Sequence, residues 1–182
     1  MTKSTSWELR RATVADAAAV AAIHVRAWQT AYRGIIPDPF LDGLDVGSRA
    51  GRYAFDRSGP GDPVTWITVE GDDVLGMVSV SPSRDEDLAG LGEVQALYVA
   101  PDRWRSGVGS SLMAKAEQLL ADAGFTEACL WVLEDNARGR RFYETAGWDA
   151  DGHAKTATIG GRGLVEVRYR KQLAGHAPEP LE

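Results

Sequence analysis

Hydrophobic and polar positions along the chain change period around residue 100. Residues 94–99 form a short apolar run, rich in β-branched and aromatic side chains, that ends just before a proline; this pattern predicts a strand. In residues 112–123 the apolar side chains recur every three or four positions and Gly124 follows, which predicts a helix. The link between them, residues 103–110, carries two glycines and two arginines.

The same periods place the other elements. Strands are predicted at 7–11, 64–70, 74–81, 128–133, 148–153 and 164–170, and helices at 13–32, 40–44, 46–57 and 137–146. The apolar strand 128–133 follows a strand and a helix, so a right-handed crossover lays it parallel to strand 94–99. This order of elements predicts an α+β fold with a mixed β-sheet.

The turn at residues 103–110 has the chemistry of an anion site. Gly107 and Gly109 let the backbone approach a ligand closely, and a helix start leaves several N–H groups unpaired. Arg103 and Arg105 add positive charge, which favours a pyrophosphate. A plain tight connection is the alternative. The third glycine of the dinucleotide fingerprint is missing, and no Gly-Lys-Ser/Thr follows for a nucleotide P-loop.

Two segments together resemble the GNAT superfamily of acyl-CoA-dependent N-acyltransferases. The first, residues 93–113, is similar to the family's Arg/Gln-x-x-Gly-x-Gly/Ala motif, with Trp104 where Arg or Gln usually stands. The second, residues 136–148, looks like the family's Asn-x-x-Ala-x-x-Phe-Tyr-x-x-x-Gly-Phe segment. The resemblance spans residues 9–170 and implies a GNAT-like mixed, centrally splayed β-sheet flanked by helices. We therefore expect one domain over residues 1–173 and a disordered tail at 174–182.

The resemblance implies acetyl-CoA as the acyl donor. The backbone of residues 97–99 would bind the pantetheine arm in the splay, and the N–H of Leu97 would polarise the thioester carbonyl. With Trp104 in the motif, the phosphate contact passes to Arg103 or Arg105. The implied cofactor-binding residues are Leu97, Tyr98, Val99, Arg103, Arg105, Ser106, Gly107, Val108, Gly109, Ser110, Asn136 and Tyr143.

Acetylation of an amine also needs proton transfer. An alkyl ammonium is neutral to only about one part in 10³ at physiological pH. Glu93, fourteen positions before Gly107, sits in the family position of a strand-borne general base; a solvated acid at a strand end is the alternative. Tyr143 matches the family's general acid, which donates a proton to the leaving sulfur. Its alternative is a tyrosine that only packs near the cofactor.

The acceptor side is less defined. His24, Trp28 and Tyr32 follow one another at intervals of four residues and therefore share one helix face. They either pack against the sheet or line an acceptor pocket. The expected activity is acetyl transfer to a primary amine of a small molecule by direct attack in a ternary complex. A non-catalytic acyl-CoA-binding regulatory module, or a protein or peptide N-acetyltransferase, is the alternative.

Composition narrows the remaining classes. The 182-residue chain has a net charge of −6, which argues against a nucleic-acid partner. It has no run of roughly 18 apolar residues and a polar start, so we expect a cytoplasmic protein without a membrane partner. The single cysteine, Cys129, excludes an internal disulfide and reads as a buried, inert thiol. We expect no metal, and whether the protein is a homodimer stays open.

Overall fold

The computed structural model describes residues 7–174, so the predicted tail beyond Ala174 lies outside the described residues. The strands are β1 (Glu8–Arg11), β2 (Val64–Glu70), β3 (Asp73–Pro82), β4 (Gly92–Val99), β5 (Glu127–Leu133), β6 (Asp149–Ile159) and β7 (Arg162–Gln172). The α-helices are α1 (Ala17–Ala31), α2 (Asp38–Asp42), α3 (Val46–Ala50), α4 (Val108–Asp122) and α5 (Ala137–Thr145). Each helix within residues 7–174 falls short of the length and apolarity that a membrane span needs.

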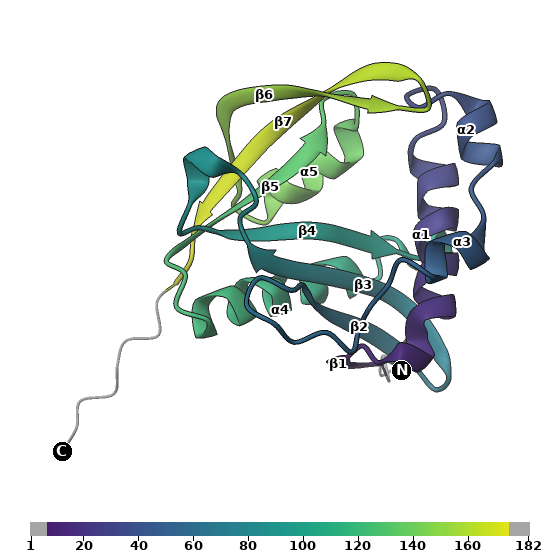
Figure 1. The fold of residues 1–182 in the computed structure, drawn as a ribbon, viewed down its shortest axis with the longest axis horizontal. Helices are drawn as coiled ribbons and strands as arrows, with labels where there is room; N and C mark the ends of the chain where they lie inside the picture. The colour runs from purple at the N-terminus through teal and green to yellow at the C-terminus, as the bar shows by residue number, and fades with distance from the viewer. Residues whose placement is uncertain (1–6, 175–182) are drawn as a thin grey trace, which may run out of the picture.

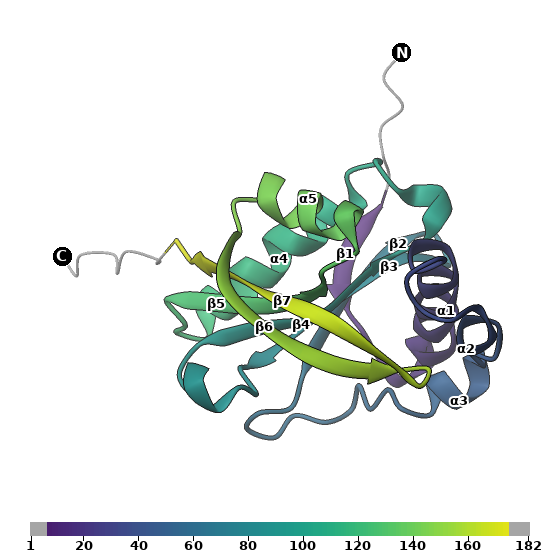
Figure 2. The ribbon, with the colours of Figure 1, turned by 90° about the horizontal axis from the view of Figure 1, so that it is seen from above.

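The described strands form one mixed sheet in the order β1-β2-β3-β4-β5-β7-β6. β4 and β5 run parallel, whereas the other neighbours are antiparallel. α4 and α5 cover one face of the sheet, and α1 lies with α2 and α3 on the other side (Figures 1 and 2). The predicted α+β class and the predicted order of elements are therefore confirmed.

The sheet opens at its centre, between β4 and β5. These strands pair only at Gly92 with Ala128 and at Glu93 with Cys129. Beyond that point they diverge, and β5 leaves with β6 and β7 (Figure 1). The parallel direction predicted from the crossover is confirmed, and the residues predicted as the central strand, 94–99, are the ones that have no pairing with β5.

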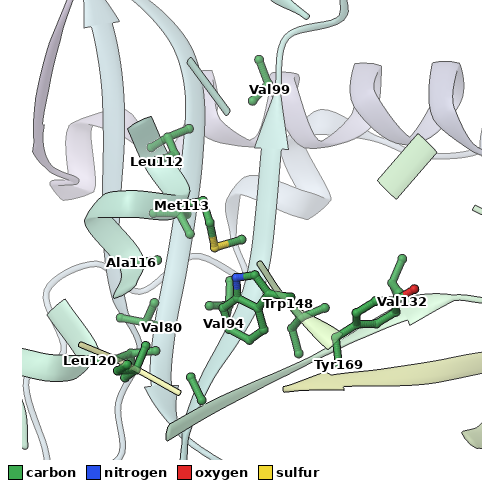
Figure 3. Packing of buried hydrophobic residues seen from close by; sticks show 14 of the residues in the cluster. Val80, Val94, Val99, Leu112, Met113, Ala116, Leu120, Val132, Trp148 and Tyr169 are labelled. Carbon is green, nitrogen blue, oxygen red and sulfur yellow. The ribbon is translucent and has the colours of Figure 1, made fainter. Parts of the chain in front are cut away.

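The main core holds this opening in place. Leu112, Met113, Ala116 and Leu120 of α4 are buried against β3 and β4, and Trp148 and Tyr169 close the core from the β5–β7 side (Figure 3). A methyl group at Gly76 of β3 would lie 2.9 Å from Cδ1 of Leu112. The absence of a side chain at Gly76 therefore lets α4 lie directly on the sheet. Each fully buried large apolar side chain contributes about 1.5–3 kcal/mol.

A second set of contacts joins the two halves across the opening. Ile36, which precedes α2, and Leu41, which lies in α2, pack with Leu133 of β5 and Leu164 of β7. The β6–β7 turn reaches α2 (Figures 1 and 2), and a Cβ at Gly160 would lie 2.8 Å from Cβ of Phe40. The tip of the β6–β7 hairpin therefore abuts the segment that follows α1.

Two boundary predictions were wrong. The helix expected over residues 46–57 ends at Ala50, because Gly47 and Gly51 weaken the helix and irregular turns follow up to β2. The strand predicted at 148–153 continues to Ile159, and the strand predicted at 164–170 is longer by two residues at each end. They form one long hairpin whose turn is Gly160-Gly161, with φ of +59° and +77°, a conformation that glycine adopts readily.

Candidate functional site

A cleft of about 1130 Å³ occupies the opening between β4 and β5. Its walls come from the C-terminal half of α1, from β4 and the turn before α4, from the end of β5, from α5 and from the β6–β7 hairpin. The lining residues therefore come from elements far apart in the sequence, which lie around the splay (Figure 2).

Most of the site residues predicted from the sequence line this cleft. They are Trp28, Tyr32, Leu97, Tyr98, Val99, Arg103, Arg105, Gly107, Gly109, Ser110, Asn136 and Tyr143. Glu93, His24, Ser106 and Val108 are not among the lining residues. Val108 is buried in the core, while the Ser106 hydroxyl donates a hydrogen bond to the carbonyl of Arg103.

The backbone of β4 presents polar groups to the opening. The N–H of Ala100 donates to the carbonyl of Leu75 in β3, whereas the carbonyl of Val99 accepts a hydrogen bond of 3.0 Å from the Trp104 indole. Since the direction of backbone polar groups alternates along a strand, Leu97 faces the same way as Val99. The pairing of β4 with β5 ends at Glu93, so the backbone of Leu97 faces the cleft without a strand partner on that side.

The turn before α4 has a conformation that suits an anion. Gly107 is the N-cap residue with φ of +92°, and no side chain caps the helix there. The first N–H groups of α4 therefore lack intrahelical acceptors, and the positive end of the helix dipole lies beside them. Arg105 is held at φ of +62°. Arg103, by contrast, donates to Glu70 at 2.8 Å, so its guanidinium is already partly engaged.

Two arginines that the sequence analysis did not single out also line the cleft. The guanidinium of Arg138 lies 3.6 Å from the centroid of the Trp104 ring, and Arg141 stands one helical turn further along α5. Trp104, which stands where the motif usually has Arg or Gln, therefore packs against the guanidinium of Arg138. The sequence pattern that could have identified them is their spacing: they lie three residues apart on the helix of the second motif, and therefore on one face of it.

Tyr143 lines the cleft from α5. Burial raises the pKa of its hydroxyl well above the ordinary value, and the neighbouring Tyr98 adds to the shift. Burial also raises the pKa of Tyr32, with smaller contributions from Tyr98, Tyr143 and Glu166. The raised pKa keeps the phenol of Tyr143 protonated at physiological pH.

The predicted aromatic row of α1 is divided between two cavities. The rings of Trp28 and Tyr32 meet edge to face at 5.2 Å and both line the cleft. His24 packs on Tyr98 at 4.3 Å but lines a smaller hollow of about 500 Å³. There its Nδ1 lies 2.8 Å from the Tyr53 hydroxyl. Burial, with a contribution from Arg49, lowers the pKa of His24 to about 3, so the ring is neutral at physiological pH.

Glu93 lies on the α1 face of the sheet and is engaged by one residue. Its side chain is 3% exposed, and Oε2 accepts from the backbone N–H of Arg84 at 3.0 Å and from Nε of Arg84 at 3.2 Å. The general-base role predicted for Glu93 stays a prediction. The observed contacts are those of an ion pair outside the cleft lining, in which Glu93 is buried and the side chain of Arg84 is exposed.

Comparison with known proteins agrees with this geometry. Residues 24–148 match the sequence profile of the Acetyltransferase (GNAT) family. The chain is 32% identical over 177 residues to a probable N-acetyltransferase of Mycobacterium tuberculosis, covering 92% of this chain and 95% of the relative. It is 34% identical over 128 residues to an N-acetyltransferase of Bacillus subtilis, covering 70% and 72%. The chain therefore belongs to the GNAT acetyltransferase family.

Solved structures share the fold at lower sequence identity. The N-acetyltransferase PaiA of Thermoplasma acidophilum, in complex with coenzyme A, superposes with a TM-score of 0.67 at 18% identity, covering 92% of this chain and 99% of that one. A Salmonella typhimurium protein solved with its cofactor acetyl-CoA gives a TM-score of 0.71 at 23% identity, covering 97% and 100%.

Proposed function

We propose that this protein transfers the acetyl group of acetyl-CoA to a primary amine of a small molecule by direct attack in a ternary complex. One observation carries the proposal: the splay between β4 and β5 opens onto the uncapped start of α4, with Tyr143 lining the same cleft. An acyl donor with a diphosphate at one end and a thioester at the other fits this arrangement, with the diphosphate at the start of α4 and the thioester near Tyr143.

The residues around the cleft fit coenzyme A. Unpartnered backbone groups of β4 suit the amides of a pantetheine arm, because a buried backbone group that lacks a hydrogen bond costs about 1–3 kcal/mol. The start of α4, with Arg105 and Arg138 beside it, suits the diphosphate. Relatives of the same fold solved with coenzyme A or acetyl-CoA support this assignment.

Two groups of this chain would assist the chemistry. The N–H of Leu97 faces the splay and would donate to the thioester carbonyl oxygen as negative charge develops there; such donors contribute about 10²–10³-fold to kcat in other enzymes. Tyr143 would donate its phenolic proton to the departing sulfur, and a general acid of this kind contributes about 10²–10⁴-fold. The raised pKa of Tyr143 supports this role, since the acid must start protonated.

The acceptor end of the cleft favours a small molecule. Trp28 and Tyr32 line it, and the tip of the β6–β7 hairpin packs over Phe40 at its margin. Arg162 of that hairpin also donates to the carbonyl of Ile35 at 3.4 Å. These contacts narrow the route by which a folded protein acceptor would approach, and they support a low-molecular-weight amine.

Two measurements on the purified protein test the proposal. Calorimetry should detect saturable binding of acetyl-CoA and CoA. Thiol release from acetyl-CoA should then depend on added amine in a panel of polyamines, amino acids, aminoglycosides, simple alkyl amines and short peptides. Saturable binding without amine-dependent thiol release would overturn the enzymatic proposal in favour of a non-catalytic acyl-CoA-binding module. Release with peptides alone would overturn the small-molecule acceptor.

A further inference from the structure

Glu166 of β7 is a half-buried acid that lines the cleft. It lies opposite Leu133 on β5 and opposite Lys155 on β6. Since side chains alternate between the faces of a strand, Arg168 and Arg170 share its face. These three residues form a charged row on the α1 side of the β5–β7–β6 part of the sheet.

The other charges of this row are neutralised by partners. Arg168 donates to Asp151 at 2.7 Å and to Asp87 at 2.8 Å, and Arg170 donates to Glu127 at 2.7 Å. Lys155, across the strand from Glu166, is directed instead to Asp85 at 3.8 Å and over the ring of Trp131. Among residues 7–174, Glu166 has no hydrogen bond or ion pair through its side chain.

The charges of the cleft are divided between its two ends. Its lining arginines come from the turn before α4 and from α5; they are Arg103, Arg105, Arg138 and Arg141. Glu166 is the one acid among the described lining residues. It comes from β7, where it pairs with Leu133 of β5, and Leu133 belongs to the cluster against which Trp28 and Tyr32 pack. Burial raises the pKa of Tyr32 and of Tyr98, and the negative charge of Glu166 adds to both shifts.

We propose that Glu166 binds the ammonium group of the acceptor and takes its proton, so that the acceptor is a primary alkyl amine that is cationic at neutral pH. The inference rests on the proposed acetyl transfer. A carboxylate that lines one cleft together with Trp28, Tyr32 and Tyr98 has the composition of a cation site, because aromatic faces attract cations and a single acid balances one charge.

The proton and electron balance is complete without another reactant. The ammonium passes one proton to the Glu166 carboxylate, and the freed nitrogen lone pair forms a C–N bond with the thioester carbonyl carbon. The C–S bond breaks with its electron pair on sulfur, which accepts the proton of Tyr143. The nitrogen loses a second proton to solvent, from which the Tyr143 phenolate is reprotonated, and Glu166 releases its proton to solvent. The products are the amide, the free thiol of coenzyme A and one proton.

The test compares Glu166→Gln, Glu166→Asp and the wild type on two classes of amine. Alkyl amines such as butylamine, 2-phenylethylamine and putrescine are protonated at neutral pH, whereas anilines and hydrazides are neutral. In Glu166→Gln, kcat/KM for alkyl amines should fall about 100-fold, at the lower end of general-base contributions, while neutral amines change far less. Glu166→Asp should lie between the two. Glu134→Gln, in an exposed acid that follows β5, is the matched control and should behave as the wild type.

Affinity for acetyl-CoA, measured by calorimetry, should be unchanged in every variant and shows that each is folded. The inference is overturned if Glu166→Gln acetylates alkyl amines as well as the wild type, or if the wild type acetylates only neutral amines. In both cases the proposed acetyl transfer survives. If the wild type binds acetyl-CoA and acetylates no amine of either class, the proposed function itself is overturned, and this inference with it.

Discussion

Arg84 holds the carboxylate of Glu93 with both its backbone and its side chain. The backbone N–H donates to Oε2 at 3.0 Å and Nε donates to the same oxygen at 3.2 Å, while Nη2 reaches Oε1. Glu93 is 2% exposed, so these bonds replace the water that an ionised carboxylate would otherwise bind. The pair fixes the β3–β4 connection to the central strand at the point where β5 begins to diverge.

The first prediction concerns Glu93→Gln. The substitution keeps the size of the side chain but removes the charge that Arg84 binds, so the free energy of unfolding should fall by about 1–3 kcal/mol. Denaturant unfolding measures this loss. The kcat/KM for amines should fall by less than about tenfold, below the usual contribution of a general base. A fall of about 100-fold or more with unchanged stability would establish Glu93 as the base.

The second prediction concerns Tyr143→Phe. Loss of the phenol should lower kcat by about 10²-fold or more, while the dissociation constant for acetyl-CoA stays within about twofold, because the ring still packs against Phe142 at a centroid distance of 5.4 Å. Tyr53→Phe removes a phenol that lines the neighbouring hollow and is the control. Unchanged kcat in Tyr143→Phe would exclude its role as general acid.

The pH dependence of kcat gives a third prediction. The acid form of Tyr143 is the active form, and burial raises its pKa above the usual value of about 10. Activity that depends on this proton is therefore fully present below pH 10 and lost only above the raised pKa. A kcat profile at saturating amine and acetyl-CoA should show no decline between pH 8 and pH 9.5. A fall of kcat in that interval, with the protein still folded, would contradict the assignment.

His24 gives a fourth prediction, on stability. Its pKa in the folded protein is lowered to about 3 by burial, whereas an unfolded chain binds the proton near pH 6.5. Below that pH the unfolded state carries more protons, so stability falls as the pH falls from 6.5 towards 3. At pH 5 the loss is up to about 2 kcal/mol. In His24→Phe the free energy of unfolding should depend less on pH between pH 7.5 and pH 5. An unchanged slope would mean that other groups cause the pH dependence.

Local patterns were enough to predict much of the fold. Thr13 and Asp16 form a capping box at the start of the helix predicted from residue 13. Asn136 caps α5 by accepting from the N–H of Gly139. Gly107, within the turn at residues 103–110, adopts the left-handed conformation at the N-cap of α4. Each of these features depends on residues within a few positions of one another. The sequence alone was therefore enough to predict these local features.

The acceptor end of the site could not be predicted in this way. Glu166 alternates with Val165 and Val167 as in any strand with one polar face. The polar face of β7 lines the cleft only because of the sheet order β5-β7-β6 and the splay between β4 and β5. The pairing of Glu93 with Arg84 likewise depends on how the β3–β4 connection folds back. Long-range topology decides the surroundings of both acids.

The last prediction uses two glycines at opposite ends of α4. Gly107 and Gly124 have φ of +92° and +91°, and a Cβ at either would meet nothing within 4 Å. Replacing either with Glu imposes the same backbone strain, of order 1–3 kcal/mol. Only Gly107→Glu also places a negative side chain at the helix start proposed to bind the diphosphate. Its affinity for coenzyme A should fall at least about tenfold, or 1.4 kcal/mol, whereas Gly124→Glu should bind normally. Equal affinities in calorimetry would mean that the start of α4 does not bind the diphosphate.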